Sequence, residues 1–248
     1  MSGIGYFFLG LKLLKEPGIR PFVILPLLVN LLLFAGLTWF LAAQLSAIAN
    51  WLNAYLPAWL EWLLWLFWLA AALLWLIVYG FSFAMISNTI AAPFYGLLAE
   101  KVQARLSLDA PQTPMTATAL MALTARTLAR EAHKLLYLLP RFLLLALISL
   151  PLYFIPVAGL VVPLLWFAWG AWSLALQNID YAADNNAMSF PAMRKSMGEN
   201  RFLSLSFGAA AVASASIPLF NLIAVPAAVA GGTAMWSDHL RQGAQPRH

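Results

Sequence analysis

Four long runs without a charged residue limit the folds open to this 248-residue chain. They cover residues 22–60, 62–99, 142–179 and 202–237, and each exceeds the roughly 20 apolar residues that a transmembrane helix needs. Hydrophobic residues make up 63% of the sequence and charged residues only 9%, so a soluble globular protein is excluded. We therefore expect an all-α integral membrane protein.

The first two runs predict two long transmembrane helices. One would extend from Phe22 to about residue 49, which is longer than the hydrocarbon core requires, so it must tilt or protrude. The other would begin near Trp62 and continue through Arg105, with a kink at Pro93. Residues 50–61 would form the turn between them, and their aromatic side chains suit the headgroup region.

Prolines interrupt each of the last two runs. Pro156 and Pro163 divide the third run, and Pro218 and Pro226 divide the fourth. The resulting apolar arms are shorter than the roughly 20 residues of a full span. Each run is therefore either one broken span or a helical hairpin that enters and leaves the membrane on the same side.

The positions of the basic residues favour the hairpins. If the outer turns lie at 50–61, 155–163 and 217–226, all 14 Lys and Arg residues fall on the opposite side of the membrane, which satisfies the positive-inside rule. We therefore predict two long transmembrane helices and two short proline-broken helical hairpins, with both termini in the cytoplasm.

Two further segments predict amphipathic helices at the membrane interface. Residues 120–139 carry a basic stripe of Arg126, Arg130 and Lys134, which would contact either anionic lipid or a ligand. Residues 2–15 form either a short interfacial helix or a frayed terminus. The helix would have one apolar face, made by Ile4, Phe7, Phe8, Leu11 and Leu14.

These elements make up a single membrane domain. Its parts in order are an interfacial helix with an anion motif (1–20), two long helices (21–105), a cytoplasmic linker with the basic helix (106–141), the first hairpin (142–179), a cytoplasmic loop (180–201), the second hairpin (202–237) and a tail (238–248).

The start of the first long helix has the composition of an anion site. Pro17 and Gly18 cannot continue a helix, Arg20 follows, and Pro21 suits the first position of a new helix. Free backbone N–H groups, the positive end of a helix dipole and a guanidinium would then converge. Gly18 would allow close approach of an anion and a positive φ. Alternatively, Arg20 is only a flanking residue whose charged end reaches the interface.

Several long motifs, in this order, resemble the CysZ-type bacterial sulfate transporters. They are PGIRPFVILPLLVN (17–30), IAAPFYGLLAEKVQARL (90–106), LPR (139–141), ALQNIDYAADN (175–185) and GGTAMWSDHLR (231–241). The resemblance implies sulfate uptake across the inner membrane for cysteine synthesis. It also implies two long transmembrane helices, two pairs of membrane-penetrating half-helices, and homo-oligomers built from dimers.

The resemblance implies that sulfate binds a Gly-x-Arg motif, which maps onto Gly18, Ile19 and Arg20. The family often has a second arginine next, where this chain has Pro21, so either sulfate binds more weakly or another basic residue substitutes. Sulfate carries no proton at neutral pH and suits a pocket of donors, whereas a carboxylate from Glu16 would disfavour it.

Other polar residues have two interpretations each. Asn30 and Asn88 lie within the long helices and either hydrogen-bond between helices or line a pathway. Asp180 and Asp184 are expected to be helix caps and loop contacts, because their charge is wrong for sulfate. Four charged residues form either an ion-pair gate or a solvated helix end, namely Glu100, Lys101, Arg105 and Arg141.

The sequence gives no sign of an enzyme. It has no cysteine, three histidines and no GxSxG or HExxH motif, so we expect no catalytic residue, cofactor or metal site. The net charge of +5 reflects cytoplasmic loops and does not indicate nucleic-acid binding. A scaffold without its own pathway is the alternative to a transporter. Because no carboxylate lies within an apolar run, channel-like permeation is favoured over proton-coupled symport.

Overall fold

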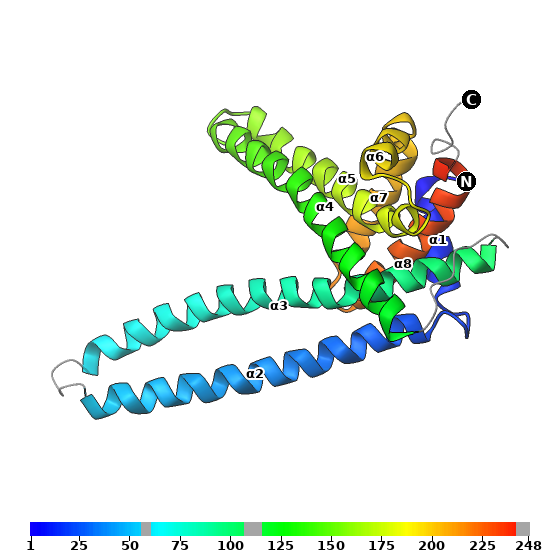
Figure 1. Ribbon diagram of the computed structural model, residues 1–248. Coiled ribbons are helices and arrows are strands. Elements are labelled where there is room, and N and C mark those ends of the chain that lie inside the picture. Colours follow the sequence, from blue (N-terminus) through cyan, green and yellow to red (C-terminus); the bar gives the residue numbers. More distant parts are fainter. Residues whose placement is uncertain (56–60, 107–115, 242–248) are drawn as a thin grey trace. The chain divides into compact units, whose positions relative to one another are not determined.

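The computed structural model describes residues 1–55, 61–106 and 116–241, and these ranges are helical with no strand (Figure 1). The expectation of an all-α protein is therefore confirmed. By length and composition, four helices among the described residues could cross a membrane. The elements are α1 (Gly3–Leu13), α2 (Pro21–Tyr55), α3 (Glu61–Leu106), α4 (Ala117–Leu152), η2 (Ala158–Val161), α5 (Val162–Asn185), α6 (Phe190–Glu199), α7 (Arg201–Ala215), α8 (Pro218–Met235) and η3 (Trp236–Leu240).

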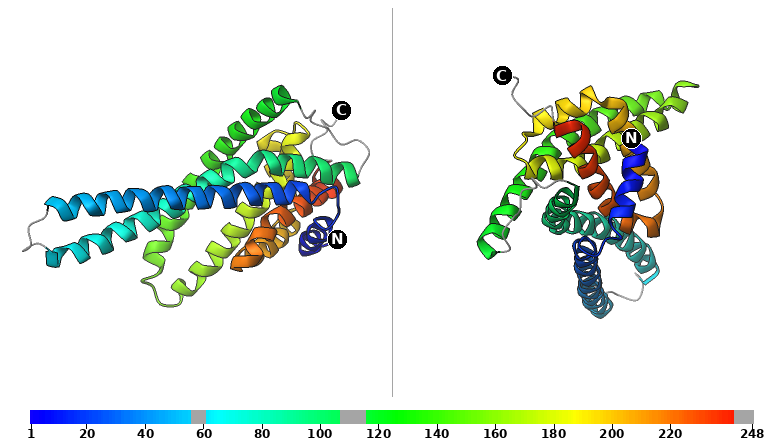
Figure 2. Two further views of the ribbon diagram at one scale, coloured as in Figure 1. Left: turned by 90° about the horizontal axis from the view of Figure 1, so that it is seen from below. Right: turned by 90° about the vertical axis from the view of Figure 1, so that its right-hand side faces the viewer.

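The chain forms two compact units, and the smaller one, Leu25–Ala91, is a pair of long helices. Figures 1 and 2 show α2 and α3 running side by side. Thr38 Oγ1 and the Tyr79 hydroxyl lie 2.8 Å apart, and the Tyr79 ring meets that of Phe34 edge-on. These are the two long helices that the first two charge-free runs predict. α2 continues to Tyr55, so the predicted turn at 50–61 begins late, and residues 56–60 lie outside the described part.

The larger unit is Met1–Ile24 with Ala92–His248. It contains one helix that the sequence predicts as two separate helices. The predicted basic helix 120–139 and the first arm of the first hairpin are one 36-residue helix, α4, of roughly 54 Å. Pro140 lies inside it, because one proline removes a single N–H donor and the flanking turns continue the helix. The Arg141 side chain donates to the Tyr137 carbonyl at 2.8 Å, in the turn that Pro140 disturbs.

The first hairpin turns sharply after α4. Val157 has φ 69°, a strained left-handed conformation for a β-branched residue, and the 3-10 turn η2 leads into α5. Pro163 lies in the first turn of α5, where its missing N–H costs nothing. The Trp166 indole N–H donates to Ser149 Oγ at 3.0 Å and links the two arms.

The second hairpin, α7 and α8, turns at Ser216 and Ile217. The predicted turn extends to Pro226, and this part is wrong because α8 runs through that residue. Pro218 opens α8 at a position where proline is favoured. The loss of one hydrogen bond at Pro226 is tolerated inside a helix whose Ala227 and Val229 side chains are buried.

Small residues bring the helices of the larger unit into close contact. A Cβ added at Gly10 of α1 would collide with the Ala227 carbonyl of α8, and one at Gly208 of α7 would collide with the Ala171 carbonyl of α5. Such close approach is typical of membrane helices, where small residues line the interfaces. Both views of Figure 2 show α1 against α8.

The face of α1 that packs against protein only partly overlaps the predicted apolar face. Ile4 and Phe8 are exposed, whereas the helix buries Gly3, Tyr6, Phe7, Gly10 and Leu13. Phe7 and Leu14 of the predicted apolar face are thus buried in the protein, while Ile4 and Phe8 stay exposed, as an interfacial helix requires. The glycines lie on the face that packs against α7 and α8, because they permit close backbone approach.

Candidate functional site

The predicted anion motif lies in the turn between α1 and α2. Its backbone donors are mostly occupied: the Glu16 carbonyl accepts hydrogen bonds from the N–H groups of Ile19 and Arg20, at 3.0 and 3.1 Å. The N–H of Phe22 in turn donates to the Ile19 carbonyl at 3.1 Å. The expectation of several free N–H groups at the start of α2 is therefore wrong, because a tight turn leads directly into the helix and uses them. The Gly18 N–H has no acceptor among the described residues.

The backbone of Gly18 is exposed and accessible to a ligand. None of the described glycines has a positive φ, so Gly18 does not use the left-handed conformation that it could tolerate. A Cβ at Gly18 would meet no protein atom within 4 Å, and the residue is exposed. Its neighbour Ile19 is buried and anchors the turn. The space in front of the Gly18 backbone is thus unfilled by the protein itself.

The Arg20 guanidinium is held at one edge only. Its Nε donates to the Lys15 carbonyl at 2.9 Å, which fixes the side chain against the preceding turn. The two terminal nitrogens have no partner among the described residues, and Arg20 is exposed. Paired donors on a planar guanidinium suit an oxyanion.

The turn and the last turns of α3 line an open cavity of about 410 Å³. Arg105 Nε lies 2.7 Å from Glu16 Oε2, so this carboxylate, expected to disfavour an anion, is neutralised by an ion pair. Lys101 Nζ lies 5.9 Å from the centre of the Phe22 ring. The lining residues are Glu16, Pro17, Gly18, Ile19, Lys101, Ala104 and Arg105, and they do not include Arg20. The structure thus joins residues that the sequence assigns separately to a binding motif and a gate.

An amide pair that sequence reasoning missed positions the end of α3. Gln103 Nε2 donates to Asn186 Oδ1 at 3.0 Å, and Asn186 Nδ2 returns a bond to Gln103 Oε1 at 2.8 Å. One residue earlier, Asn185 Nδ2 donates to the Gly96 carbonyl at 2.7 Å. These bonds dock α3 on the end of α5 and so hold Lys101 and Arg105 beside the turn. The motif ALQNIDYAADN contained part of this signal, but the pairing depends on tertiary structure.

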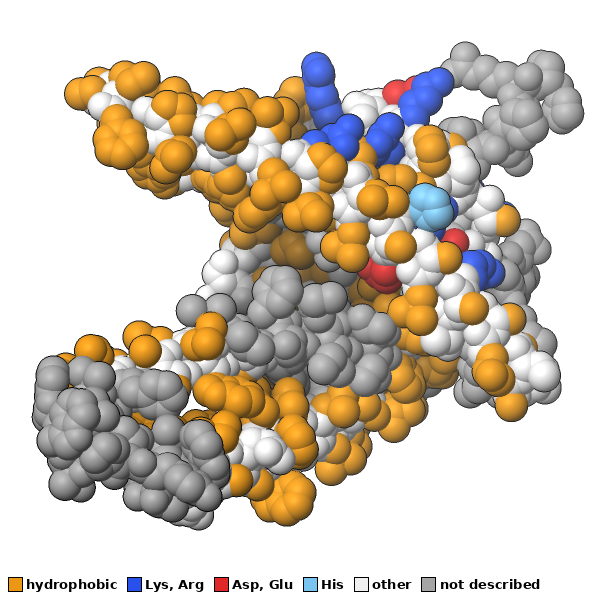
Figure 3. Space-filling view, turned by 60° about the vertical axis from the view of Figure 1, so that its left-hand side comes forward, with side chains coloured by type: hydrophobic (Ala, Val, Ile, Leu, Met, Phe, Trp, Pro, Cys, Tyr) orange, Lys and Arg blue, Asp and Glu red, His pale blue; other side chains and the backbone are white. Residues whose placement is uncertain are grey.

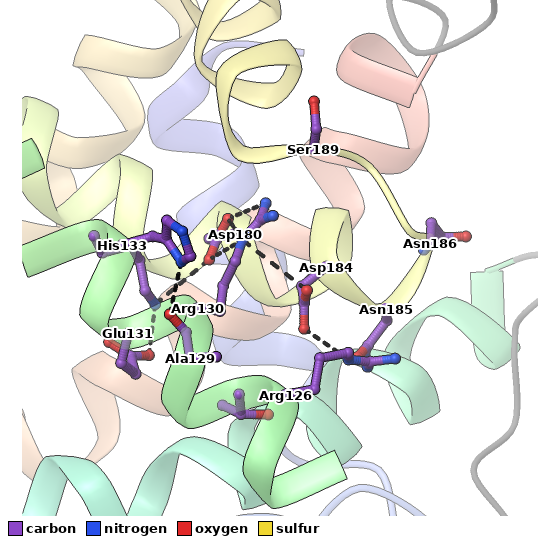
Figure 4. A network of polar contacts seen from close by, with 12 residues as sticks. Arg126, Ala129, Arg130, Glu131, His133, Asp180, Asp184, Asn185, Asn186 and Ser189 are labelled. Atoms are coloured by element: carbon purple, nitrogen blue, oxygen red, sulfur yellow. Dashed lines mark hydrogen bonds and ion pairs between the residues drawn. The ribbon is translucent and has the colours of Figure 1, made fainter. Parts of the chain in front are cut away.

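The basic stripe of α4 faces protein carboxylates (Figure 4). Arg130 Nε and NH2 both donate to Asp180 Oδ1, at 3.0 and 2.7 Å, and Arg126 Nε donates to Asp184 Oδ2 at 3.1 Å. Lys134 Nζ lies 3.6 Å from Asp180 Oδ2. Asp180 and Lys134 are only 1% and 2% exposed. The stripe is therefore not a lipid-facing or ligand-facing surface, since opposite charges on α5 neutralise most of it.

The expectation that Asp180 and Asp184 are helix caps or loop contacts is wrong. Asp180 and Asp184 lie inside the last turns of α5, not at a helix cap or in a loop. Their spacing of four residues puts both carboxylates on the face that meets α4. The expectation failed because the sequence placed the end of this helix before Asp180.

Four other predicted residues are not among those that line the cavity, and one of them, Glu100 of α3, is buried. The contacts observed for Arg141 are with Tyr137 of its own helix, not with the end of α3. The Oδ1 of Asn30, in α2, is buried and has no hydrogen-bond partner among the described residues. The side chain of Asn88 lies outside the described part.

Comparison with known families adds an independent finding. Residues 6–226 match the family model described as EI24: Sulfate transporter CysZ/Etoposide-induced protein 2.4. The match begins in α1 and ends in α8, so it covers the turn, the cavity and the α4–α5 ion pairs.

Proposed function

This chain belongs to the sulfate transporter CysZ/EI24 family, and on that premise we propose that it imports sulfate across the bacterial inner membrane for cysteine synthesis. The family is one of transporters, and the described helices are those of a multi-pass membrane protein. The anion first binds at the turn between α1 and α2, in front of Gly18 and beside the end of α3. The observation that supports this most directly is the open cavity that combines Gly18 with Lys101 and Arg105.

Donors for sulfate come from the α1–α2 turn and from α3. The Gly18 N–H lacks an acceptor among the described residues, and the terminal nitrogens of Arg20 are available on the same turn. Lys101 and Arg105 come from α3, and we infer that they supply the cation that Pro21 removes from the usual family motif. Sulfate needs no acceptor, whereas monoprotonated phosphate needs one, so this set favours sulfate.

Glu16 tunes the affinity of the site. Its carboxylate pairs with Arg105, so an arriving sulfate must compete for the guanidinium. The pair is largely exposed, with 66% of the Arg105 side chain accessible, and exposed ion pairs contribute only about 0–1 kcal/mol. Sulfate can therefore displace the carboxylate at small cost. A weak internal competitor suits a transporter, which has to release what it binds.

We further propose channel-like permeation by a homo-oligomer built from dimers. The orphaned Oδ1 of Asn30 supports a hydrated path along α2, because a buried polar atom without a protein partner is satisfied by water. Exposed apolar residues such as Leu32 and Trp39 on α2 provide surface for lipid or for a second copy.

Radiolabelled sulfate uptake into liposomes that contain the purified protein tests this function. We expect uptake down a sulfate gradient, above that of protein-free liposomes, and competition by unlabelled sulfate but only weakly by phosphate. Uptake equal to that of empty liposomes, by protein shown to be folded and inserted, would support the alternative of a scaffold without a pathway. The matched control is the Lys101→Met/Arg105→Met variant, which should lose most of the uptake.

A further inference from the structure

Two arginines from different helices stack on a single tyrosine ring. The guanidinium carbons of Arg141 in α4 and Arg194 in α6 lie 3.8 and 4.5 Å from the centre of the Tyr137 ring. Phe190, at the start of α6, packs edge-on against the same ring, with centroids 5.7 Å apart. Cation–π contacts of this kind orient a guanidinium without using its N–H donors, of which Arg141 spends one on the Tyr137 carbonyl. The Tyr137 ring thus holds the two guanidinium groups near each other.

Unlike the basic residues earlier on α4, Arg141 and Arg194 do not pair with a carboxylate among the described residues. Lys134 and Arg130, about two and three turns earlier on α4, are paired with Asp180. Neither Arg141 nor Arg194 has an acidic partner among the described residues. Two like charges at this separation repel each other, so an anion that contacts both would relieve the repulsion.

The site lies where α4 changes from charged to apolar. Beyond Arg141 the helix exposes a row of large apolar side chains, with Leu147 68% accessible, and the others are Phe142, Leu143, Leu144, Ile148 and Leu150. Figure 3 shows hydrophobic side chains covering the arm at the upper left and Lys and Arg side chains gathered at its base. Tyrosine and arginine at such a border are typical of the headgroup level of a membrane.

We propose that Arg141 and Arg194 form a binding site for the phosphate of an anionic phospholipid, whose acyl chains lie along the exposed apolar face of α4. The two positive guanidinium groups are complementary to the negative phosphate, and the adjacent apolar side chains of α4 are complementary to the acyl chains. Basic pockets between helices at the cytoplasmic face bind anionic headgroups in this way. The proposal is separate from the sulfate cavity, whose residues come from the α1–α2 turn and α3.

Native mass spectrometry of the purified protein tests the proposal by titration with phosphatidylglycerol or with phosphatidylcholine of the same chain length. We expect phosphatidylglycerol to bind more tightly. Arg141→Gln and Arg194→Gln should each weaken its binding by roughly fivefold, and Arg141→Lys/Arg194→Lys should retain most of it. The matched control is Arg201→Gln, since this arginine also lies over a single ring, that of Phe202 at 5.3 Å, but has no second arginine there. Its phosphatidylglycerol binding should equal that of the wild type.

A second measurement needs no variant. A photoactivatable phosphatidylglycerol analogue bound to the wild type should cross-link to peptides of α4 beyond Arg141. Three results would overturn the proposal: equal binding of the two lipids, unchanged phosphatidylglycerol binding in Arg141→Gln/Arg194→Gln, or displacement of the lipid by inorganic sulfate. The last result would assign the two arginines to the transport path.

Discussion

Arg130 in α4 and Asp180 in α5 form a hydrogen-bonded ion pair, with Arg130 NH2 2.7 Å and Nε 3.0 Å from Asp180 Oδ1. Lys134 lies on the other side of the carboxylate and also contacts Glu131, 2.5 Å from its Nζ. The Tyr181 hydroxyl donates to Glu131 at 3.3 Å and closes the cluster. The buried Asp180 carboxylate thus contacts both Arg130 and Lys134 and fixes α5 against α4.

Asp180→Asn should strongly destabilise the protein. The amide cannot neutralise Arg130 and Lys134, and breaking a buried ion pair costs about 3–5 kcal/mol. We expect a clear fall in the thermal unfolding midpoint in detergent. Arg126→Gln is the matched control, because the Arg126 side chain is 48% exposed and its pair with Asp184 contributes about 0–1 kcal/mol. Equal losses in the two variants would contradict the role assigned to burial.

Gly10→Ala should disrupt the packing of α1 on α8. The new methyl group would meet the Ala227 carbonyl and the Gly231 N–H, which are backbone atoms and cannot move aside. Overpacking of this kind typically costs about 1–3 kcal/mol. Gly36→Ala is the control, since a Cβ there meets no atom within 4 Å and alanine is favoured in a helix. The thermal midpoint should fall in the first variant and not in the second.

The sequence predicted the helices better than their contacts. Charge-free runs locate α2 and α3 because the bilayer imposes that pattern directly. Pro140 shows the limit of local rules: proline is unfavourable inside a helix, yet α4 continues through it, because a proline removes only one backbone N–H donor. Which face of α1 is buried could not be read from apolar periodicity, since the contact depends on Gly10 meeting α8.

The candidate site was predicted in pieces. Gly18 and Ile19 follow from a motif and Lys101 and Arg105 from a charge cluster, but the sequence does not show that they share a cavity. The position of α3 beside the turn depends on the hydrogen bonds between Gln103 and Asn186. Nothing in the sequence around these two residues indicates that they pair. The partners of Asp180 were missed for the same reason, because residues 50 positions apart in the chain meet only after folding.

Arg20→Ala should weaken sulfate binding by roughly 10- to 150-fold, since a charge-assisted hydrogen bond contributes about 1.5–3 kcal/mol. Arg20→Lys should recover only part of this, because an ammonium group cannot donate two parallel bonds. Pro21→Arg should tighten binding by restoring the usual family pair. Calorimetric titration of sulfate into monodisperse protein measures all three. Wild-type affinity in Arg20→Ala would leave this arginine as a topology anchor.

The topology is testable because the chain has no cysteine, so each introduced thiol reports alone. Cysteines at 110–115, outside the described residues, should be labelled from the same side as tags on both termini. A cysteine in place of Tyr55, at the end of α2, should be labelled from the opposite side. The expectation rests on the one-sided distribution of Lys and Arg. Labelling of 110–115 from outside would exclude the hairpin arrangement.

Glu16 and Arg105 allow the charge balance of the cavity to be varied directly. Glu16→Gln removes the carboxylate that competes with sulfate, and one unit charge at about 4 Å contributes roughly 1 kcal/mol even in water, so affinity should rise about fivefold. Arg105→Gln should lower the affinity, because it removes a cation and leaves the Glu16 carboxylate unpaired. Both effects should shrink at high ionic strength, since the pair is exposed. Glu199→Gln, an exposed carboxylate at the end of α6, is the control and should leave sulfate binding unchanged. Weaker binding in Glu16→Gln would mean that the carboxylate acts by holding Arg105 in place, and that this positioning outweighs its repulsion of the anion.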